Sequence, residues 1–374
     1  MSAEEAKAPP VEGEEVPAEG APEAVEEVVP EEDLIPVMAL DEFYPESFVD
    51  KVIPDSTLSK RTMQFYECLG QSSFKRYNYH WLGDSDFIYA AGNTYQIYNV
   101  ESKTRRIFHG TDTDGIGSIC VHPSRKYFAV AEKGPMPNIY IYEWPSLKLY
   151  RICKKGTEMK YAHVEFSSSG TKLASLGGAP DYTLTVWDWL SQGVILKSKA
   201  FSQEVFRVSF SPYTDDILFT AGSGHIKFWK MAQTFTGLKL QDEIAKFGQL
   251  ELSDVSSYYE LPDGKVVSGT EYGTLIVWEG QFVKAHLVLD VENNIPLHKG
   301  MIEVLLQDED YYVTAGADGY IKWWRISDID QAEAEEGLEF AIAPTREIRI
   351  AENEDGKNPA YIVNMILADK TWYI

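Results

Sequence analysis

One segment of twelve residues sets the pattern for this chain: Val313-Thr314-Ala315-Gly316-Ala317-Asp318-Gly319-Tyr320-Ile321-Lys322-Trp323-Trp324. It begins with a short β-branched run, passes through a turn rich in Gly and Asp, and ends in alternating aliphatic and aromatic residues. Alternation with a period of two is typical of a strand, and Gly and Asp are typical of the turn between two strands. The segment therefore predicts a β-hairpin that turns at Asp318.

The same pattern returns at a regular interval along the chain. Two further clear copies are Val267–Trp278 and Leu218–Trp229, and weaker copies end at Trp187, Tyr142 and Tyr98. The six endpoints lie 42 to 49 residues apart, near the roughly 40–45-residue period of a WD40 propeller blade. One small sheet cannot bury both of its faces, so the copies must pack around a common axis. The sequence predicts an all-β fold, a WD40-type β-propeller with six recognisable blades.

Strand patterns continue after the sixth copy. They lie at Glu347–Ile350 and Tyr361–Leu367, and the chain ends within a further one at Trp372-Tyr373-Ile374. An unfinished strand leaves apolar side chains and backbone groups unpaired, so we expect a partial seventh blade and interpret the chain as a fragment of a longer protein. The acidic run Ser327–Glu339 fits either a surface helix or a flexible insertion, and we favour the insertion.

Acidic residues are concentrated at the N-terminus. The formal net charge is −24, and residues 1–33 hold twelve acidic residues against one lysine. Residues 1–36 lack an apolar period and are predicted to be a disordered acidic tail, which we interpret as a solvated leader rather than a docking peptide. Pro45 and Pro54 limit regular structure over 37–62, a predicted lead-in segment, which leaves 63–374 for the propeller.

Charge and cysteine usage restrict the classes of partner. A strongly acidic chain is repelled by phosphate backbones and anionic lipids, so we expect neither nucleic acid nor membrane partners. The three cysteines, Cys68, Cys120 and Cys153, are too scattered for a disulfide framework or paired zinc ligands. No stretch approaches the roughly 20 apolar residues of a membrane span, so we expect a cytosolic protein. We expect protein partners, no metal and no cofactor.

One set of residues resembles a catalytic triad. It comprises His298, Thr314 and Asp318, with Trp324 close by. The spacing places Asp318 in a turn, Thr314 and Trp324 on the flanking strands, and His298 in the preceding loop. A carboxylate that orients an imidazole, which in turn bonds a hydroxyl, satisfies buried polar groups and clamps a blade. Because other copies keep only parts of the set, we interpret it as a structural tetrad and predict no catalytic residue.

Two features near the fourth copy need separate interpretation. His225 lies in a hairpin without other metal ligands nearby, so we predict a surface turn residue rather than a ligand. Phe235 and Leu238 follow the end of the copy, where exposed apolar residues are costly. Either they pack on the core or the rim, which we favour, or they contact a partner.

Several segments go beyond the generic blade pattern and resemble the N-terminal propeller of the cilia- and flagella-associated WD-repeat proteins of the axoneme. They are Val121-His122-Pro123, Phe128–Gly134, Pro180–Trp187, Ala200–Phe206, Gly222–Trp229, Met231–Gln241 and Glu260–Val266. The resemblance spans residues from about 65 to 325. It implies a non-enzymatic scaffold that, with a paralogous WD-repeat protein, tethers inner-arm dynein motor domains to the doublet microtubule and is needed for ciliary movement.

Two other functions stay open from the residues alone. The same fold serves as a general adaptor or substrate receptor in cytosolic complexes. A propeller hydrolase would need titratable groups that converge on the central channel, where the sequence indicates none beyond the tetrad.

Overall fold

The computed structural model describes residues 70–73, 75–111, 114–333, 338–350, 359–368 and 371–374. All of them belong to one compact unit, Glu67–Ile374. The predicted acidic tail and lead-in segment lie outside the described residues. Where the chain is described, its regular secondary structure is almost entirely strand, and no helix there is long and apolar enough to cross a bilayer.

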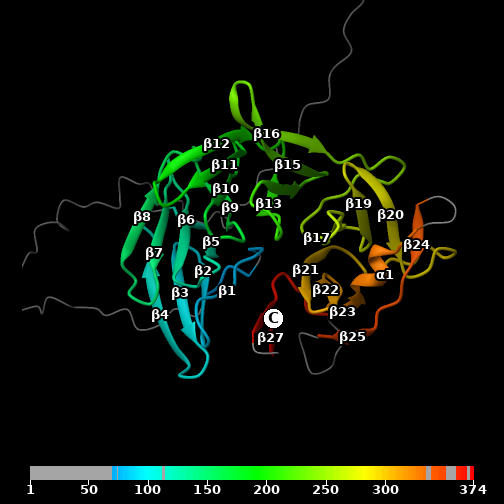
Figure 1. The fold of residues 1–374 in the computed structure, drawn as a ribbon. Coiled ribbons are helices and arrows are strands. Elements are labelled where there is room, and N and C mark those ends of the chain that lie inside the picture. Colours follow the sequence, from blue (N-terminus) through cyan, green and yellow to red (C-terminus); the bar gives the residue numbers. More distant parts are fainter. Residues whose placement is uncertain (1–69, 74, 112–113, 334–337, 351–358, 369–370) are drawn as a thin grey trace, which may run out of the picture. The chain divides into compact units, whose positions relative to one another are not determined.

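Six sheets lie side by side around a common centre (Figure 1), which confirms the predicted propeller. The first blade comprises β1 (His80–Trp81), β2 (Asp86–Ala91), β3 (Thr94–Asn99) and β4 (Thr104–His109). The second comprises β5 (Ile116–Val121), β6 (Tyr127–Glu132), β7 (Ile139–Glu143) and β8 (Leu149–Cys153). The third comprises β9 (Tyr161–Phe166), β10 (Leu173–Gly177), β11 (Thr183–Asp188) and β12 (Gly193–Lys199).

The other three blades follow the same order. The fourth comprises β13 (Val205–Phe210), β14 (Ile217–Gly222), β15 (His225–Thr234) and β16 (Gly237–Ile244). The fifth comprises β17 (Tyr258–Glu260), β18 (Val266–Gly269), β19 (Leu275–Glu279), β20 (Phe282–Val288) and, parallel to β20, β24 (Glu339–Ala341). The sixth comprises β21 (Ile302–Asp308), β22 (Tyr311–Gly316), β23 (Tyr320–Arg325) and β25 (Arg346–Arg349).

Each aromatic endpoint of the sequence repeat lies in the third strand of its blade. The four tryptophans among them, Trp187, Trp229, Trp278 and Trp324, are at most 1% exposed. Each packs in a cluster with the second or third strand of the preceding blade; Trp324, for example, shares a cluster with Leu275. The core is therefore formed between blades, which is why an isolated copy could not be stable.

A two-stranded sheet, β26 (Ile366–Ala368) and β27 (Thr371–Tyr373), lies between the sixth and first blades (Figure 1). The Tyr373 ring meets Trp81 of the first blade edge to face at 5.1 Å, and the Trp372 ring meets Trp323 of the sixth blade at 6.3 Å. A two-stranded piece therefore lies where the partial seventh blade was predicted, whereas the strand predicted at Glu347–Ile350 is β25 and completes the sixth blade.

The acidic run after the sixth copy is not simply an insertion. It opens as the helix α1 (Ile326–Asp330), whose Ile329 is fully buried against the core of the fifth and sixth blades. It ends at the start of β24, where Glu339 pairs with His286 of β20. The interpretation as a flexible insertion is therefore wrong for both ends of the run. The first end packs on the core through Ile329, and the second end pairs with the free edge of β20.

Successive strands of a blade are antiparallel, so their turns alternate between two faces of the ring. One face, called the top face below, carries the turns between second and third strands and the connections from blade to blade. The other, called the bottom face, carries the turns between first and second strands. This division decides which loops can form a site together.

Candidate functional site

The predicted tetrad is present on the top face of the sixth blade. Trp324 Nε1 donates a hydrogen bond to Thr314 Oγ1 at 2.7 Å. His298 Nε2 lies 2.7 Å from the same hydroxyl, and its Nδ1 lies 3.0 Å from Asp318 Oδ1. Because the Asp318 carboxylate can only accept, Nδ1–H donates to it, which leaves Nε2 of the neutral imidazole to accept the hydroxyl proton of Thr314. All four groups occupy the predicted positions.

The tetrad's geometry clamps the blade and offers no open nucleophile. The Thr314 hydroxyl is fully buried, and both its donor and acceptor functions are used within the tetrad. The Asp318 carboxylate also accepts the backbone N–H groups of Lys299 at 2.9 Å and Tyr320 at 3.1 Å. Burial works to raise the pKa of Asp318, but the hydrogen bonds from His298 and these amides outweigh it and lower that pKa. A covered, fully bonded hydroxyl cannot attack a substrate.

Three other blades keep the bond from indole to hydroxyl, and the third also keeps a turn carboxylate, Asp181, which accepts a hydrogen bond from Thr157 Oγ1 at 2.8 Å. The indole–hydroxyl pairs, each with a donor–acceptor distance of 2.8 Å, are Trp187 with Ser175, Trp229 with Thr220, and Trp278 with Ser268. The repetition supports the structural interpretation, because each pair satisfies an indole N–H buried between blades.

Residues 75–80, here called the axial segment, occupy the centre of the ring, which the sequence pattern did not indicate. Arg76 forms a two-pronged ion pair with Glu303 of β21, with Nε–Oε2 and Nη2–Oε1 distances of 2.6 and 2.9 Å. The Tyr77 hydroxyl donates to the carbonyl oxygen of Ser256 at 2.7 Å. The segment therefore contacts inner strands and connections far from it in sequence and closes the central channel.

Arg207 of β13 completes this closure. Its guanidinium lies 4.4 Å from the centre of the Tyr77 ring and 4.6 Å from that of Tyr258. It also donates to the backbone oxygen of Tyr258 at 2.9 Å. The hydrogen bond and the faces of the two tyrosine rings together stabilise the charged guanidinium inside the propeller.

A cavity of about 250 Å³ beside the axial segment brings Cys120, His163 and Glu165 together, contrary to the prediction that titratable groups do not converge there. Burial raises the pKa of the Cys120 thiol and, with the nearby Arg207, lowers the pKa of His163 to about 3. A reactive thiolate and an imidazolium need the opposite shifts. Burial raises the pKa of Glu165 to about 7 against the attraction of Arg207. The shifts of Cys120 and His163 therefore run against a thiolate–imidazolium pair in this cavity.

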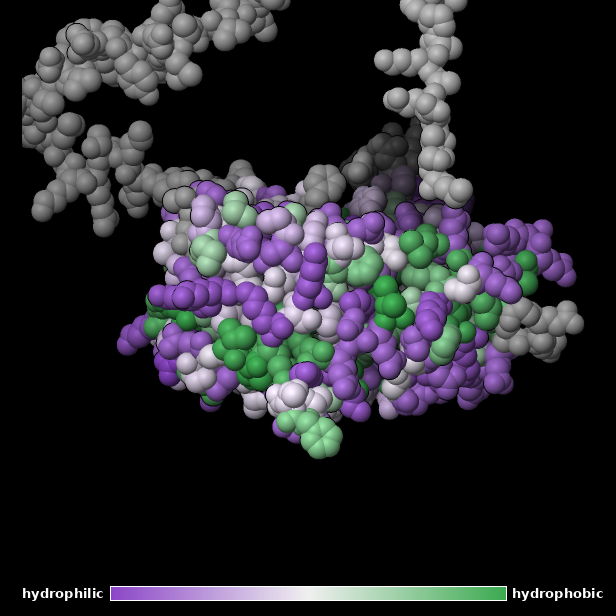
Figure 2. Space-filling view, turned by 90° about the horizontal axis from the view of Figure 1, so that it is seen from above, coloured by the Kyte–Doolittle hydropathy of each residue, from purple (hydrophilic) through white to green (hydrophobic). Residues whose placement is uncertain are grey.

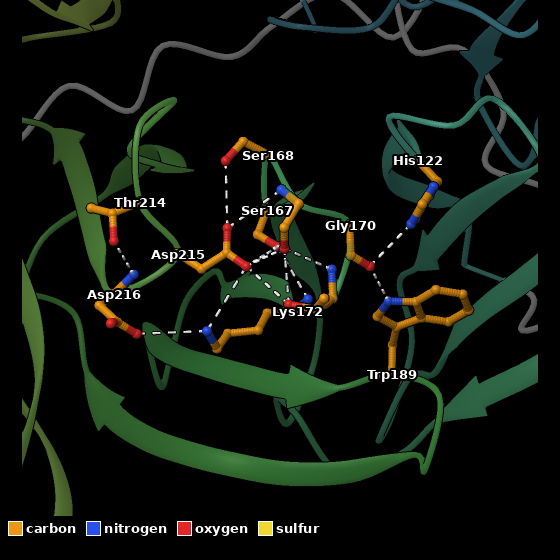
Figure 3. A network of polar contacts seen from close by, with 11 residues as sticks. His122, Ser167, Ser168, Gly170, Lys172, Trp189, Thr214, Asp215 and Asp216 are labelled. Carbon is orange, nitrogen blue, oxygen red and sulfur yellow. Dashed lines mark hydrogen bonds and ion pairs between the residues drawn. The ribbon is translucent and has the colours of Figure 1, made fainter. Parts of the chain in front are cut away.

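The bottom face carries a second polar network, drawn in Figure 3. Asp215, in the turn between β13 and β14, accepts hydrogen bonds from Ser167 Oγ at 3.1 Å, Thr171 Oγ1 at 2.9 Å and the Ser169 hydroxyl. Lys172 Nζ lies 3.9 Å from the same carboxylate. Burial alone would raise the pKa of Asp215, but these hydroxyl groups outweigh it and lower that pKa. The carboxylate thus joins the turns of the third and fourth blades.

The third blade's turn is joined to the second blade in the same view. Its Gly170 carbonyl oxygen accepts Trp189 Nε1 at 2.8 Å and lies 3.0 Å from His122 Nε2 (Figure 3). A side chain at Gly170 would come within 2.2 Å of the His122 ring, so glycine is required for this approach. The network therefore holds three neighbouring turns in place and is a structural clamp rather than a reactive site.

Three half-buried lysines gather on the top face. Lys75, Lys133 and Lys160 line a cavity of about 350 Å³ formed by the connections and turns of the first four blades. We call it the lysine pocket. The sequence did not indicate it, because the three residues come from separate segments and only the fold brings them together.

Two predictions near the fourth blade are corrected by the structure. His225 is fully buried and its ring stacks on Phe201 at a centroid distance of 3.6 Å, so it is not a surface turn residue. Phe235 is fully exposed at 112%, and Leu238 is 40% exposed. β15 and β16 have ten and eight residues and form a long ribbon with Phe235 at its tip, so the packing interpretation is wrong for Phe235.

Figure 2 looks onto the rim of the ring and shows a mainly hydrophilic surface with separate hydrophobic patches. Against such a surface, an exposed phenylalanine at a ribbon tip is an accessible apolar anchor.

Replacing Phe235 with alanine is expected to leave the melting temperature within about 1 °C of the wild type, because a fully exposed ring contributes little burial. The matched control is Phe219→Ala in β14, whose 3% exposed ring packs against Tyr258 and whose loss costs about 3–5 kcal/mol. Differential scanning fluorimetry compares the two. Equal destabilisation would mean that the Phe235 ring is packed in solution.

Comparisons with known proteins give concordant matches. The family model described as echinoderm microtubule-associated protein first beta-propeller matches residues 106–363. Cilia- and flagella-associated protein 44 from Mus musculus is 46% identical over 283 residues, which cover 75% of this chain and 15% of the mouse protein. The protein of the same name from Chlamydomonas reinhardtii is 43% identical over 261 residues, covering 67% of this chain and 15% of its own length.

A third relative is more distant. The 77 kDa echinoderm microtubule-associated protein of Strongylocentrotus purpuratus is 27% identical over 296 residues, which cover 75% of this chain and 41% of that protein. This chain spans about 15% of the length of the two more similar relatives. The matches confirm the resemblance found in the sequence segments.

Proposed function

The chain belongs to the family described as echinoderm microtubule-associated protein first beta-propeller and is homologous to cilia- and flagella-associated protein 44, and from this premise we propose that it is a non-enzymatic scaffold of the axoneme. In this role it helps to tether inner-arm dynein motor domains to the doublet microtubule, together with a paralogous WD-repeat protein. The observation that carries the proposal is the 46% identity with the mouse protein, which extends over 75% of the chain.

The chemistry of the described residues supports a scaffold over a hydrolase. The Thr314 hydroxyl is enclosed in the tetrad, and burial disfavours the charged forms of both Cys120 and His163 beside the axis. A rigid ring held by interblade clamps instead presents its loops in fixed positions, which suits a docking platform.

Crosslinking mass spectrometry on isolated axonemes tests the proposal with the protein in its natural setting. We expect crosslinks from surface lysines of the propeller, such as Lys230 and Lys239, to an inner-arm dynein heavy chain, to its paralogue and to tubulin. Axonemes from cells that lack the protein are the control, and their beating should be impaired. Recovery of the protein only in a soluble cytosolic complex would favour the general adaptor instead.

A further inference from the structure

We propose that the lysine pocket on the top face binds a glutamate-rich segment of a partner protein through the segment's carboxylates. The inference rests on the proposed function only in taking the top face as a protein-docking surface, and it adds the chemistry of one partner. Its test uses purified protein, so that its outcome is independent of where the protein resides.

The pocket is built to hold three ammonium groups near one another. Lys75 comes from the axial segment, Lys133 directly follows β6, and Lys160 directly precedes β9. The backbones of Lys133 and Lys160 form an isolated antiparallel bridge, and Gly178 N–H donates to the carbonyl oxygen of Lys160 at 2.8 Å. A side chain at Gly178 would come within 2.4 Å of Lys160 Cε. The absence of that side chain lets the Lys160 stem lie along the pocket wall.

The positive charge of the pocket is not neutralised by the described part of the chain. There, none of the three lysines has a carboxylate within ion-pair distance, although the chain as a whole carries −24. Among the described residues, Lys75 Nζ donates to the backbone oxygen of Ile116, at 2.6 Å. The lining holds one carboxylate, that of the exposed Glu204, and one further cation, Arg76, which is paired with Glu303.

The lowered pKa of Lys75 indicates that the described part of the pocket lacks a negative charge beside this lysine. Burial, assisted by repulsion from Lys133, lowers the pKa of Lys75 to about 7. A carboxylate placed beside the three lysines would counteract this lowering, because a nearby opposite charge favours the charged form of a lysine. The pocket therefore gains favourable charge interactions by taking up an anion.

Size and charge decide which anion fits. The axial segment lines the pocket with Lys75 and Arg76, and the volume of about 350 Å³ lies near the lower end of the roughly 300–1,000 Å³ typical of ligand sites. It admits a few side chains of an extended peptide and is too small for a folded domain. The net charge of −24 on the chain would repel a nucleic acid duplex, whose charge extends far beyond the pocket. A short run of glutamates places its carboxylates in the pocket without that extended repulsion.

Fluorescence anisotropy with a fluorescein-labelled deca-glutamate peptide and the full 374-residue chain tests the proposal. Binding is expected at low ionic strength and should weaken as salt is added. The double variant Lys133→Gln/Lys160→Gln should raise the dissociation constant for the peptide by about tenfold or more. Lys230→Gln/Lys239→Gln, which makes the same change of charge on the exposed β15–β16 ribbon, should bind like the wild type.

Three outcomes would overturn the proposal. One is no binding by the wild type, and another is equal weakening in the two double variants, which would indicate non-specific attraction. The third concerns the acidic residues of this chain itself. If carbodiimide joins Lys133 or Lys160 to glutamates within residues 1–33 of the same dilute chain, the pocket is occupied from within. Melting curves of both variants confirm that a loss of binding is not a loss of folding.

Discussion

Replacing Glu303 with alanine is expected to lower the free energy of unfolding by about 2–4 kcal/mol, because it leaves the Arg76 guanidinium inside the ring without its partner. The Glu303 side chain is 2% exposed and that of Arg76 is 27% exposed, so water can compensate only part of the loss. Glu303 also accepts the Tyr361 hydroxyl at 2.8 Å. Burial and this bond to a carboxylate raise the pKa of Tyr361 to about 12, so the tyrosine remains a donor at neutral pH.

The location of Glu303 makes the effect global rather than local. Arg76 belongs to the axial segment, in which Asn78 holds the first blade by accepting Ala90 N–H at 2.8 Å. Asn364, which precedes the partial seventh blade, donates to the Lys75 carbonyl oxygen at 2.7 Å. Freeing the axial segment therefore weakens the contacts that connect the first, sixth and seventh blades.

A double-mutant cycle measures the pair itself. Glu303→Leu and Arg76→Met together should be less destabilising than the sum of the single changes, with a coupling above about 1 kcal/mol, since an isosteric apolar pair removes both charges. Asp242→Ala is the control. It breaks the ion pair with Lys227, which has the same 2.6 Å separation but lies on the rim, and should cost less than about 1 kcal/mol. If urea unfolding gave equal costs for Glu303→Ala and Asp242→Ala, the axial closure would not depend on this pair.

The features that the sequence predicted correctly depend on short, repeated spacings. The hairpin at Asp318 is local, and the bond between Thr314 and Trp324 joins residues of that same hairpin, ten positions apart. The packing of the tryptophans between blades follows from their period, because each copy forms a sheet whose two apolar sides must both be buried against neighbouring blades. Local order and repetition therefore specified the fold class, the tetrad and the partial seventh blade.

The features that it missed depend on contacts between distant segments. Arg76 and Glu303 are 227 residues apart, and neither belongs to a repeated pattern. Whether Phe235 is packed depends on how far β15 and β16 extend beyond the rim, which strand propensity does not determine. One missed feature, the convergence of titratable groups on the cavity beside the axial segment, did leave a signal in the sequence. His163 and Glu165 are two positions apart on the inner strand of the third blade, and residues two apart on a strand point to the same side.

Replacing His298 with alanine is expected to destabilise the propeller by about 2–4 kcal/mol without abolishing any reaction, because it leaves a buried cavity and removes one hydrogen bond from each of two buried polar groups. Thr314 loses the acceptor for its proton, and Asp318 loses a donor. Thermal and urea unfolding measure the change. Ser268→Ala in the fifth blade is the matched control, since it removes only the bond from Trp278 and should cost about 1 kcal/mol.

The tetrad also predicts a dependence on pH that separates a structural clamp from a solvated surface group. The pKa of Asp318 is lower in the folded than in the unfolded chain. The ionised Asp318 carboxylate therefore stabilises the fold fully above the ordinary aspartate pKa of about 4. This stabilisation is lost as the pH falls from that pKa to the lower folded value. The stability advantage of the wild type over Asp318→Asn should therefore be constant from about pH 7 to 5 and shrink below about pH 4. Ser268→Ala removes no titrating group, so the difference in unfolding free energy between this variant and the wild type should not change with pH. An advantage over Asp318→Asn that did not shrink in acid would show that the Asp318 carboxylate does not stabilise the blade through its charge.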